Sequence, residues 1–536
     1  MSAAAGAPGT GTPDPSEAAA RIAAGYTTEG PAIELGSVLL GGRAHPEAQV
    51  RIPLAMLNRH GLIAGATGTG KTKTLQLIAE QLSAAGVPVV LADLKGDLAG
   101  LVRPGESGDR VTRRAADTGD AWVPTGFPVE YLALGALGTG VPVRATITDF
   151  GPVLLSKVLD LNDTQESSLG LVFHYADEAG LPLLDLKDLR AVLTWLTSDE
   201  GRADLKGLGG LSPATVGVIL RELIALEDLG GDVFFGEPAW EPADLIRLAP
   251  DGRGVISAVE LMAVQDRPAL FSTFLMWLLA ELFEDLPEVG DVDRPKVVFF
   301  LDEAHLLFTG ASKAFLEAVT QTVRLIRSKG VGVFFVTQNP TDVPGPVLGQ
   351  LGNRVQHALR TFTPEDADAL RKTVRTFPTS TDYELGELLT ALGTGEAAVT
   401  VLSERGAPTP VAATMLRAPR SSMGAVEEPV RAGVVAASPL QARYGTAIDR
   451  ESAYERLAAK LAPPPERVPK GRAREPQRET RPELAPSRRR RREPEADGGV
   501  VGAVLGSSAF RAFARSAASA LGREISRGIF GTRRRR

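Results

Sequence analysis

Residues 60–72 read HGLIAGATGTGKT, and the class of fold can be inferred from these residues and their neighbours. Its first part, residues 61–64, is a short apolar run of the kind that forms a buried strand. A Gly-rich loop follows, and residues 73–85 then place apolar side chains at helical spacing. Residues 87–92 form a second apolar run. The order strand, loop, helix and strand predicts a βαβ unit with a right-handed crossover, and therefore a parallel sheet.

The Gly-rich loop fits the pattern G-x-x-x-x-G-K-[ST] over its whole length. Its residues are Gly65, Ala66, Thr67, Gly68, Thr69, Gly70, Lys71 and Thr72. Glycines let backbone N–H groups turn inward and surround phosphates, and the helix that follows adds its positive end. Lys71 is expected to contact the β and γ phosphates, and Thr72 to bind Mg²⁺. A chance match in a loop rich in Gly and Thr is the alternative, but the flanking strand and helix favour an ATP and Mg²⁺ site.

An acidic pair follows another apolar run. Residues 297–301 read VVFFL, and Asp302 and Glu303 come directly after them. In open parallel sheets this end of a strand faces the ligand crevice. We expect Asp302 to hold Mg²⁺, directly or through water, and Glu303 to act as the base that orients the attacking water. Alone, such a pair is often only a strand that ends in solvent.

Polar residues near the next strands supply further candidates. Residues 331–336 form an apolar strand pattern, and Gln338 follows it, placed to contact the γ phosphate or the attacking water. A cap on the following turn is the alternative. An extra cation stabilises a phosphoryl group in its transition state. The candidates for this role are Arg324, Arg327, Arg354 and Arg360. A surface salt bridge is as good an interpretation for any one of them.

The stretch DLKGD, after the second strand, contains Asp93, Lys95 and Asp97. These residues also lie at the carboxyl end of a strand of the expected sheet. They either support the nucleotide site, or couple it to a ring pore, or form a plain turn. The sequence alone leaves these interpretations open.

The rest of the chain divides by composition and pattern. We expect residues 1–30 to be disordered, residues 31–418 to form the ATPase domain, and a helical insertion to occupy about 150–250. A small hairpin is expected over 33–40 and 50–54. Further strands are expected at 254–258, 297–301, 331–337, 355–359, 397–402 and 411–415. The fold class is thus α/β, with a mostly parallel sheet and a helical insertion.

The last part of the chain differs in charge. Residues 419–497 are expected to form a connector that becomes a charged, Pro-rich linker. Residues 466–536 carry nineteen Lys and Arg against eight Asp and Glu, a net charge of +11. Because the whole chain has a net charge of −6, residues 1–465 carry −17. Residues 498–536 are expected to form a flexible basic tail with an amphipathic helix. Its partner is an anionic membrane surface, DNA or the protein's own acidic core.

Composition excludes several classes of protein. The chain has 536 residues, 43% of them hydrophobic, and no cysteine, so neither disulfides nor thiolate metal sites are available. The first twenty residues lack the basic and apolar regions of a secretory signal. No stretch of about 18 uncharged apolar residues is present. We expect a cytoplasmic protein, with the membrane or the nucleoid as possible peripheral locations.

These motifs, in this order, resemble the HerA–FtsK superfamily of P-loop ATPases, and most closely its bacterial HerA-like helicase C-terminal-domain proteins. The resemblance is carried by HGLIAGATGTGKT (60–72), VVLADLKGDLAGL (89–101), VVFFLDEAH (297–305), LIRSKGVGVFFVTQNP (325–340) and LGNRVQHALRTFTP (351–364). It implies a RecA-like core, ATP hydrolysis and a ring-shaped homo-oligomer, usually a hexamer. It also implies that Gln338 is the polar sensor and that Arg354 or Arg327 serves the ring interface.

Two functions remain open at this level. The resemblance favours a ring-forming motor that moves along or unwinds DNA. The acidic body and the lack of a sequence-reading motif favour instead an ATPase that remodels or regulates a protein partner, without translocating nucleic acid. A nucleotide-dependent switch or membrane-associated scaffold with weak turnover is a third possibility.

Overall fold

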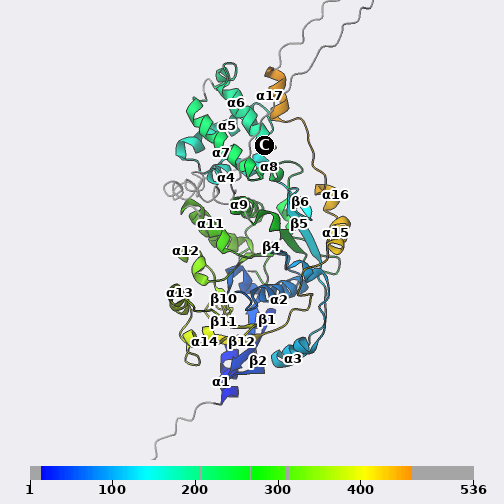
Figure 1. Ribbon diagram of the computed structural model, residues 1–536, viewed down its shortest axis with the longest axis vertical. Helices are drawn as coiled ribbons and strands as arrows, with labels where there is room; N and C mark the ends of the chain where they lie inside the picture. The colour runs from blue at the N-terminus through cyan, green and yellow to red at the C-terminus, as the bar shows by residue number, and fades with distance from the viewer. Residues whose placement is uncertain (1–13, 206–207, 266, 291, 309–312, 462–536) are drawn as a thin grey trace, which may run out of the picture.

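The protein is described from a computed structural model, which covers residues 14–205, 208–265, 267–290, 292–308 and 313–461. A 12-stranded sheet runs through it in the order β2-β1-β12-β11-β10-β3-β9-β8-β4-β7-β5-β6 (Figure 1). The strands are β1 (Ala32–Leu40), β2 (Arg43–Pro53), β3 (Gly61–Ala64), β4 (Val89–Asp93), β5 (Val129–Leu134), β6 (Val141–Val143), β7 (Ile256–Glu260), β8 (Val297–Leu301), β9 (Val331–Thr337), β10 (Asn353–Gln356), β11 (Glu396–Thr400) and β12 (Ala412–Leu416).

The sheet is mixed but mostly parallel, so the predicted α/β class is confirmed. From β10 to β6 every neighbouring pair is parallel, whereas β10–β11, β11–β12, β12–β1 and β1–β2 are antiparallel. The predicted hairpin is the pair β1 and β2. The central strand β3 lies between β10 and β9, where Ile63 is level with Val355 and Val336. The carboxyl ends of β10, β3, β9, β8 and β4 therefore meet at one edge.

Helices cover both faces of the sheet. Successive residues of a strand point to opposite faces, so Phe300 packs in the same core as Ile78 of α2, and Phe299 in the core that contains α9 and α11. The helices are α1 (Pro15–Ala24), α2 (Lys71–Ala84), α3 (Asp109–Thr118), α4 (Ile147–Val158), α5 (Asp163–Glu178), α6 (Leu186–Thr197), α7 (Pro213–Asp228), α8 (Gly231–Phe234), α9 (Pro268–Asp285), α10 (His305–Phe308), α11 (Lys313–Ile326), α12 (Gly345–Leu348), α13 (Pro364–Val374), α14 (Leu385–Ala391), α15 (Glu428–Ala437), α16 (Gln441–Tyr444) and α17 (Ala453–Leu461).

The helices between β6 and β7 form the insertion. Helices α4 to α8 group at the top of Figure 1, beyond the parallel end of the sheet. Their apolar faces continue the core of the sheet, because Leu189 and Leu193 of α6 pack in the same cluster as Phe299. Within the described residues, no helix is both long and apolar enough to cross a membrane.

The expectation that residues 1–30 are disordered is wrong for the part that the structure describes. Helix α1 begins after Asp14, whose carboxylate accepts a hydrogen bond from the Ser16 N–H at 3.1 Å. Its face of Ala18, Ala19 and Ile22 is buried, and the last two pack in the core beside β1 and β2. Ala-rich composition suggests disorder, but the spacing of these residues is that of an amphipathic helix. Residues 1–13 lie outside the described part.

The connector expected from residue 419 packs on the body as far as residue 461. Val426 is buried beside Tyr131 of β5, and Arg431 of α15 pairs with Glu260 at 2.9 Å. Helix α17 then packs against α6 of the insertion (Figure 1). The pattern was weak because these helices are short and each buries only a few side chains. The rest of the linker and the basic tail, residues 462–536, lie outside the described residues.

Before α15 the chain crosses α2, the helix that follows the Gly-rich loop. The buried carboxylate of Glu80 accepts backbone hydrogen bonds from Arg420 at 2.7 Å and from Ser421 at 3.0 Å. About two helix turns toward the loop, the Lys73 ammonium donates to the Met423 carbonyl at 2.6 Å. We call residues 417–424 the strap. The strap is therefore hydrogen-bonded to α2 at two positions along the helix.

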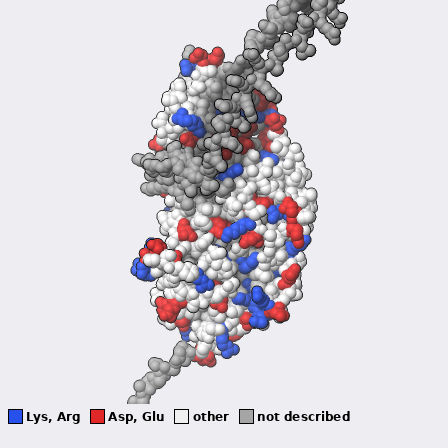
Figure 2. All heavy atoms as spheres, viewed as in Figure 1, with Lys and Arg blue, Asp and Glu red and all other residues white. Residues whose placement is uncertain are grey.

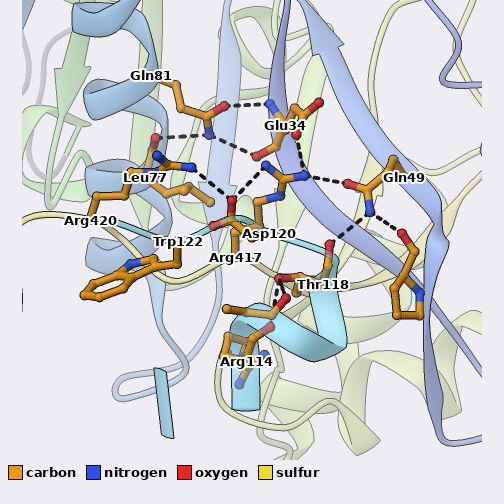
Figure 3. Close-up of polar contacts among 12 residues, drawn as sticks. Glu34, Gln49, Leu77, Gln81, Arg114, Thr118, Asp120, Trp122, Arg417 and Arg420 are labelled. Carbon is orange, nitrogen blue, oxygen red and sulfur yellow. Dashed lines mark hydrogen bonds and ion pairs between the residues drawn. The ribbon is translucent and has the colours of Figure 1, made fainter. Parts of the chain in front are cut away.

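A polar cluster anchors the start of the strap (Figure 3). It consists of Glu34, Gln49, Asp120, Arg417 and Arg420. The Arg417 guanidinium pairs with Glu34, donates to Gln49 at 2.9 Å and pairs with Asp120 at 3.3 Å. Arg420 pairs with the same Asp120 at 3.0 Å. The Asp120 side chain is only 4% exposed, so both arginines depend on one buried carboxylate.

Candidate functional site

The Gly-rich loop connects β3 to α2, as the sequence predicts, and two of its glycines are required by their surroundings. Gly65 has φ 153°, and a Cβ there would lie 2.5 Å from the Cβ of His357. Gly70 has φ 114° at the N-cap of α2, a left-handed conformation that favours glycine. The His357 side chain is fully buried, and its Nε2 lies 2.8 Å from the Thr74 hydroxyl. The loop therefore rests on a histidine that the sequence pattern gave no reason to select.

Gly65→Ala is expected to weaken nucleotide binding by about tenfold or more and to destabilise the fold by about 1–3 kcal/mol, since overpacking displaces His357 or the loop. Binding of fluorescent ADP and the melting temperature measure the two effects. Gly41→Ala is the control for a left-handed glycine, because nothing lies within 4 Å of a Cβ there. Equal effects at both positions would contradict the contact with His357.

Lys71 points back over its own loop. Its Nζ donates to the carbonyls of Gly65 at 2.7 Å and Ala66 at 3.1 Å. Burial lowers the pKa of Lys71, and the charge of Glu303 opposes that shift. Thr72, the next residue, is half-buried at the first turn of α2. The two side chains thus stand where a phosphate chain on this helix end would need a cation and a metal ligand.

Asp302 and Glu303 follow β8 and lie at the same sheet edge. Asp302 Oδ1 accepts a hydrogen bond from the Glu303 N–H at 2.9 Å, and its buried Oδ2 has no hydrogen-bond partner in the described part of the chain. Burial raises the pKa of Asp302 to about 7, against the opposing hydrogen bond from Glu303. Glu303 has φ 47°, an uncommon backbone conformation for a glutamate.

A Mg²⁺ ion fits this arrangement when it is shared with phosphate oxygens. An orphaned carboxylate oxygen on Asp302 and the hydroxyl of Thr72 are hard oxygen donors of the type that Mg²⁺ prefers. Over the residues that the structure covers, no group of three or more His, Cys, Asp or Glu side chains is placed to hold a metal alone. Mg²⁺ commonly binds through one or two protein ligands plus substrate phosphates, which agrees with this limited donor set.

Asp302→Asn is expected to stabilise the protein above pH 7 by at least about 1 kcal/mol, since each unit of pKa shift is worth 1.36 kcal/mol. A carboxyl whose pKa is raised by folding favours the folded state while it is protonated. That contribution is complete below the unfolded pKa, near 4, and is lost as the pH rises through about 7. Melting temperatures at pH 5 and pH 8, with EDTA and no nucleotide, measure this. A difference between variant and parent that does not grow with pH would contradict it.

The remaining predicted residues differ in how far they are exposed to solvent. Gln338 is exposed directly after β9. Arg327 is exposed in the short turn after α11, and so is Arg324 on that helix. Arg354 is different: its guanidinium donates to the carbonyls of Thr376 at 2.7 Å, Leu351 at 3.3 Å and Leu348 at 3.4 Å. To reach a neighbouring chain, Arg354 would first have to give up these bonds.

The DLKGD stretch separates into two roles. Asp93 is a turn residue, since its carboxylate accepts backbone hydrogen bonds from Lys95, Gly96 and Leu98 at 3.2, 2.7 and 3.1 Å. Lys95 has a different role, because its Nζ forms an ion pair with Glu303. The parallel pairing of β4 with β8 brings these two residues together. The sequence pattern placed both at strand ends but could not say that the strands are neighbours.

A comparison with protein families matches most of the chain. The sequence model described as Helicase HerA-like C-terminal matches residues 39–536. No curated protein matches the chain. Among solved structures, the plasmid coupling protein TrwB in complex with ADP and Mg²⁺ is 16% identical with a TM-score of 0.49, covering 76% of this chain and 94% of that one. VirB4 of Thermoanaerobacter pseudethanolicus is 15% identical with a TM-score of 0.43, covering 73% and 98%. At these values, neither likeness indicates a substrate.

Proposed function

This chain belongs to the Helicase HerA-like C-terminal family, and on that premise we propose that it is an ATP-hydrolysing, ring-forming motor of the HerA–FtsK type that acts on DNA. The ATPase part is supported by one arrangement. The Gly-rich loop with Lys71 and Thr72 stands at the same sheet edge as Asp302 and Glu303. Lys71 and the loop bind the phosphates, Thr72 and Asp302 hold Mg²⁺, and Glu303 accepts a proton from the attacking water.

The ring part rests on the family and on the exposed arginines. Arg327, exposed in the turn after α11, is the candidate for a neighbouring chain's γ phosphate, whereas the guanidinium of Arg354 donates to carbonyls of its own chain. Mixing Lys71→Ala chains with Arg327→Ala chains tests for shared sites. Partial recovery of activity is expected, because some sites in a mixed ring combine an intact loop with an intact arginine. A protein that stays monomeric with ATP analogue at micromolar concentration would rule out the ring.

The DNA part rests on the family alone. Turnover is expected to rise several-fold with single-stranded or duplex DNA at low salt and less at moderate salt, since contacts to phosphates weaken as salt increases. ATPase rates with and without DNA, at two salt concentrations, measure this. Lys71→Ala serves as the inactive control. Intact basal turnover with a flat response to DNA would contradict DNA as the substrate.

Such a flat response would favour the second candidate, an ATPase that remodels or regulates a protein partner. A specific observation keeps this candidate in view. On the face shown in Figure 2, Lys and Arg are interspersed with Asp and Glu, and no broad area of the described surface there is basic. Together with a body that carries −17 up to residue 465, this surface offers no extended phosphate-binding track on that face.

A further inference from the structure

The carboxylate of Glu303, which is expected to activate water, forms an ion pair with a lysine. Glu303 Oε1 forms an ion pair with the Lys95 ammonium, and Glu303 Oε2 lies 3.2 Å from His305 Nδ1. The Glu303 side chain is 9% exposed, whereas that of Lys95 is 48% exposed. A carboxylate held by an ammonium is a poor acceptor for a proton from water. This ion pair therefore has to open before Glu303 can act as a base.

Of the two partners, Lys95 is the one built to move. Its backbone is fixed, because the Asp93 carboxylate accepts the N–H of Lys95 and of Gly96, and Gly96 turns with φ 73°. Its side chain is long, half-exposed and attached by four rotatable bonds. Glu303 is held more firmly, since its N–H donates to Asp302 and its carbonyl accepts from the Leu306 N–H at 2.9 Å. Lys95 can thus swing while both backbones stay in place.

The phosphate-binding loop is within electrostatic reach of this pair. The charges of Glu303 and Lys95 both act on Lys71, in opposite directions, after the larger effect of burial. Lys71 in turn lies on the loop carbonyls of Gly65 and Ala66. An anionic phosphate chain gripped by the loop would bring a second attractive partner to the Lys95 ammonium, and one with more charge than Glu303.

We propose that Lys95 is the residue that senses the terminal phosphate: it leaves Glu303 to pair with the γ phosphate of ATP, and so frees Glu303 to accept a proton. This inference rests on the proposed ATPase function of the same site. It assigns Lys95 a binding role that is specific for a triphosphate, because the β phosphate of ADP is already held by the loop and Lys71. When ADP is bound, Lys95 therefore stays paired with Glu303.

The test compares the affinities of the full chain for fluorescent ATPγS and fluorescent ADP, each with Mg²⁺. Lys95→Met is expected to weaken ATPγS binding by about tenfold or more, the loss of one charge-assisted contact, and to change ADP binding less than about twofold. Lys95→Arg is expected to keep the preference for ATPγS. Lys187→Met is the matched control, since Lys187 is a 38% exposed lysine of the helical insertion that pairs with Asp185 and Asp449.

A second measurement does not depend on how well a Lys95 variant folds. Glu303→Gln removes the competing partner of Lys95, so this variant is expected to bind ATPγS more tightly than the parent, with no gain for ADP. Unchanged discrimination in Lys95→Met, or equal losses for both nucleotides, would overturn the proposal. So would a Glu303→Gln chain with parental affinity for ATPγS. A parent chain that binds neither nucleotide would instead remove the proposed ATPase function itself.

Discussion

Glu303→Gln is expected to lower the rate of ATP hydrolysis by about 10²-fold or more while nucleotide binding persists, the scale of a lost general base. The amide has nearly the shape of the carboxylate but cannot accept a proton from water. Glu303 also stands at the carboxyl end of β8, at the edge that carries the Gly-rich loop. Phosphate release in single-turnover experiments, with bound nucleotide measured in parallel, separates the chemical step from binding.

Glu166→Gln is the matched control for this change. Glu166 is a mostly buried glutamate in the helical insertion, and it too pairs with a lysine, Lys157, at 2.6 Å. Its loss tests whether removing any buried glutamate that pairs with a lysine slows turnover through the fold. A normal rate in Glu303→Gln would show that Glu303 is not the base. A comparable loss in both variants would point to a structural effect.

Asp120→Ala is expected to destabilise the protein by about 3 kcal/mol, near the lower end of the cost of breaking a buried ion pair. The change leaves the guanidinium groups of Arg417 and Arg420 without their shared carboxylate (Figure 3). Arg417 keeps its contacts with Glu34 and Gln49, and for this reason the larger costs are not expected. The shift in the urea midpoint, followed by tryptophan fluorescence, measures the effect.

Asp199→Ala provides the comparison at the surface. Asp199 pairs with Arg202 at 3.3 Å, but the two side chains are 94% and 57% exposed. Solvent screens such a pair, so no measurable shift of the midpoint is expected. If Asp120→Ala also left the urea midpoint unchanged, the cluster in Figure 3 would contribute nothing to stability, and the strap would be anchored by other contacts.

The parts of the site that depend on local sequence could be predicted. The Gly-rich loop, the strand before it and the helix after it lie within 25 residues, and their patterns are unambiguous. The pair Asp302 and Glu303 could be placed because an apolar run directly precedes it. The hairpin of β1 and β2, the insertion and the remaining long strands follow from the same kind of pattern. The predicted strand ends differ from the observed ones by at most three residues, except that β2 begins at Arg43, seven residues before the predicted start at residue 50.

The parts that depend on strand order could not be predicted. Lys95 meets Glu303 only because β4 pairs with β8, and His357 lies under Gly65 only because β10 pairs with β3. Nothing in a linear pattern specifies these neighbours. Strands β5 and β6 are not predicted either, since a six-residue and a three-residue strand carry little periodicity, and β5 pairs with β7, more than 100 residues later.

The strap has a consequence for how the chain folds during its synthesis. Glu80 is buried on α2, and the partners of its carboxylate, Arg420 and Ser421, stand 340 and 341 positions later. The nucleotide-binding loop is therefore synthesised early, whereas the residues that donate hydrogen bonds to Glu80 of α2 are synthesised late. Contacts between such distant positions form slowly during folding. These contacts of Glu80 therefore form only when most of the chain has been synthesised.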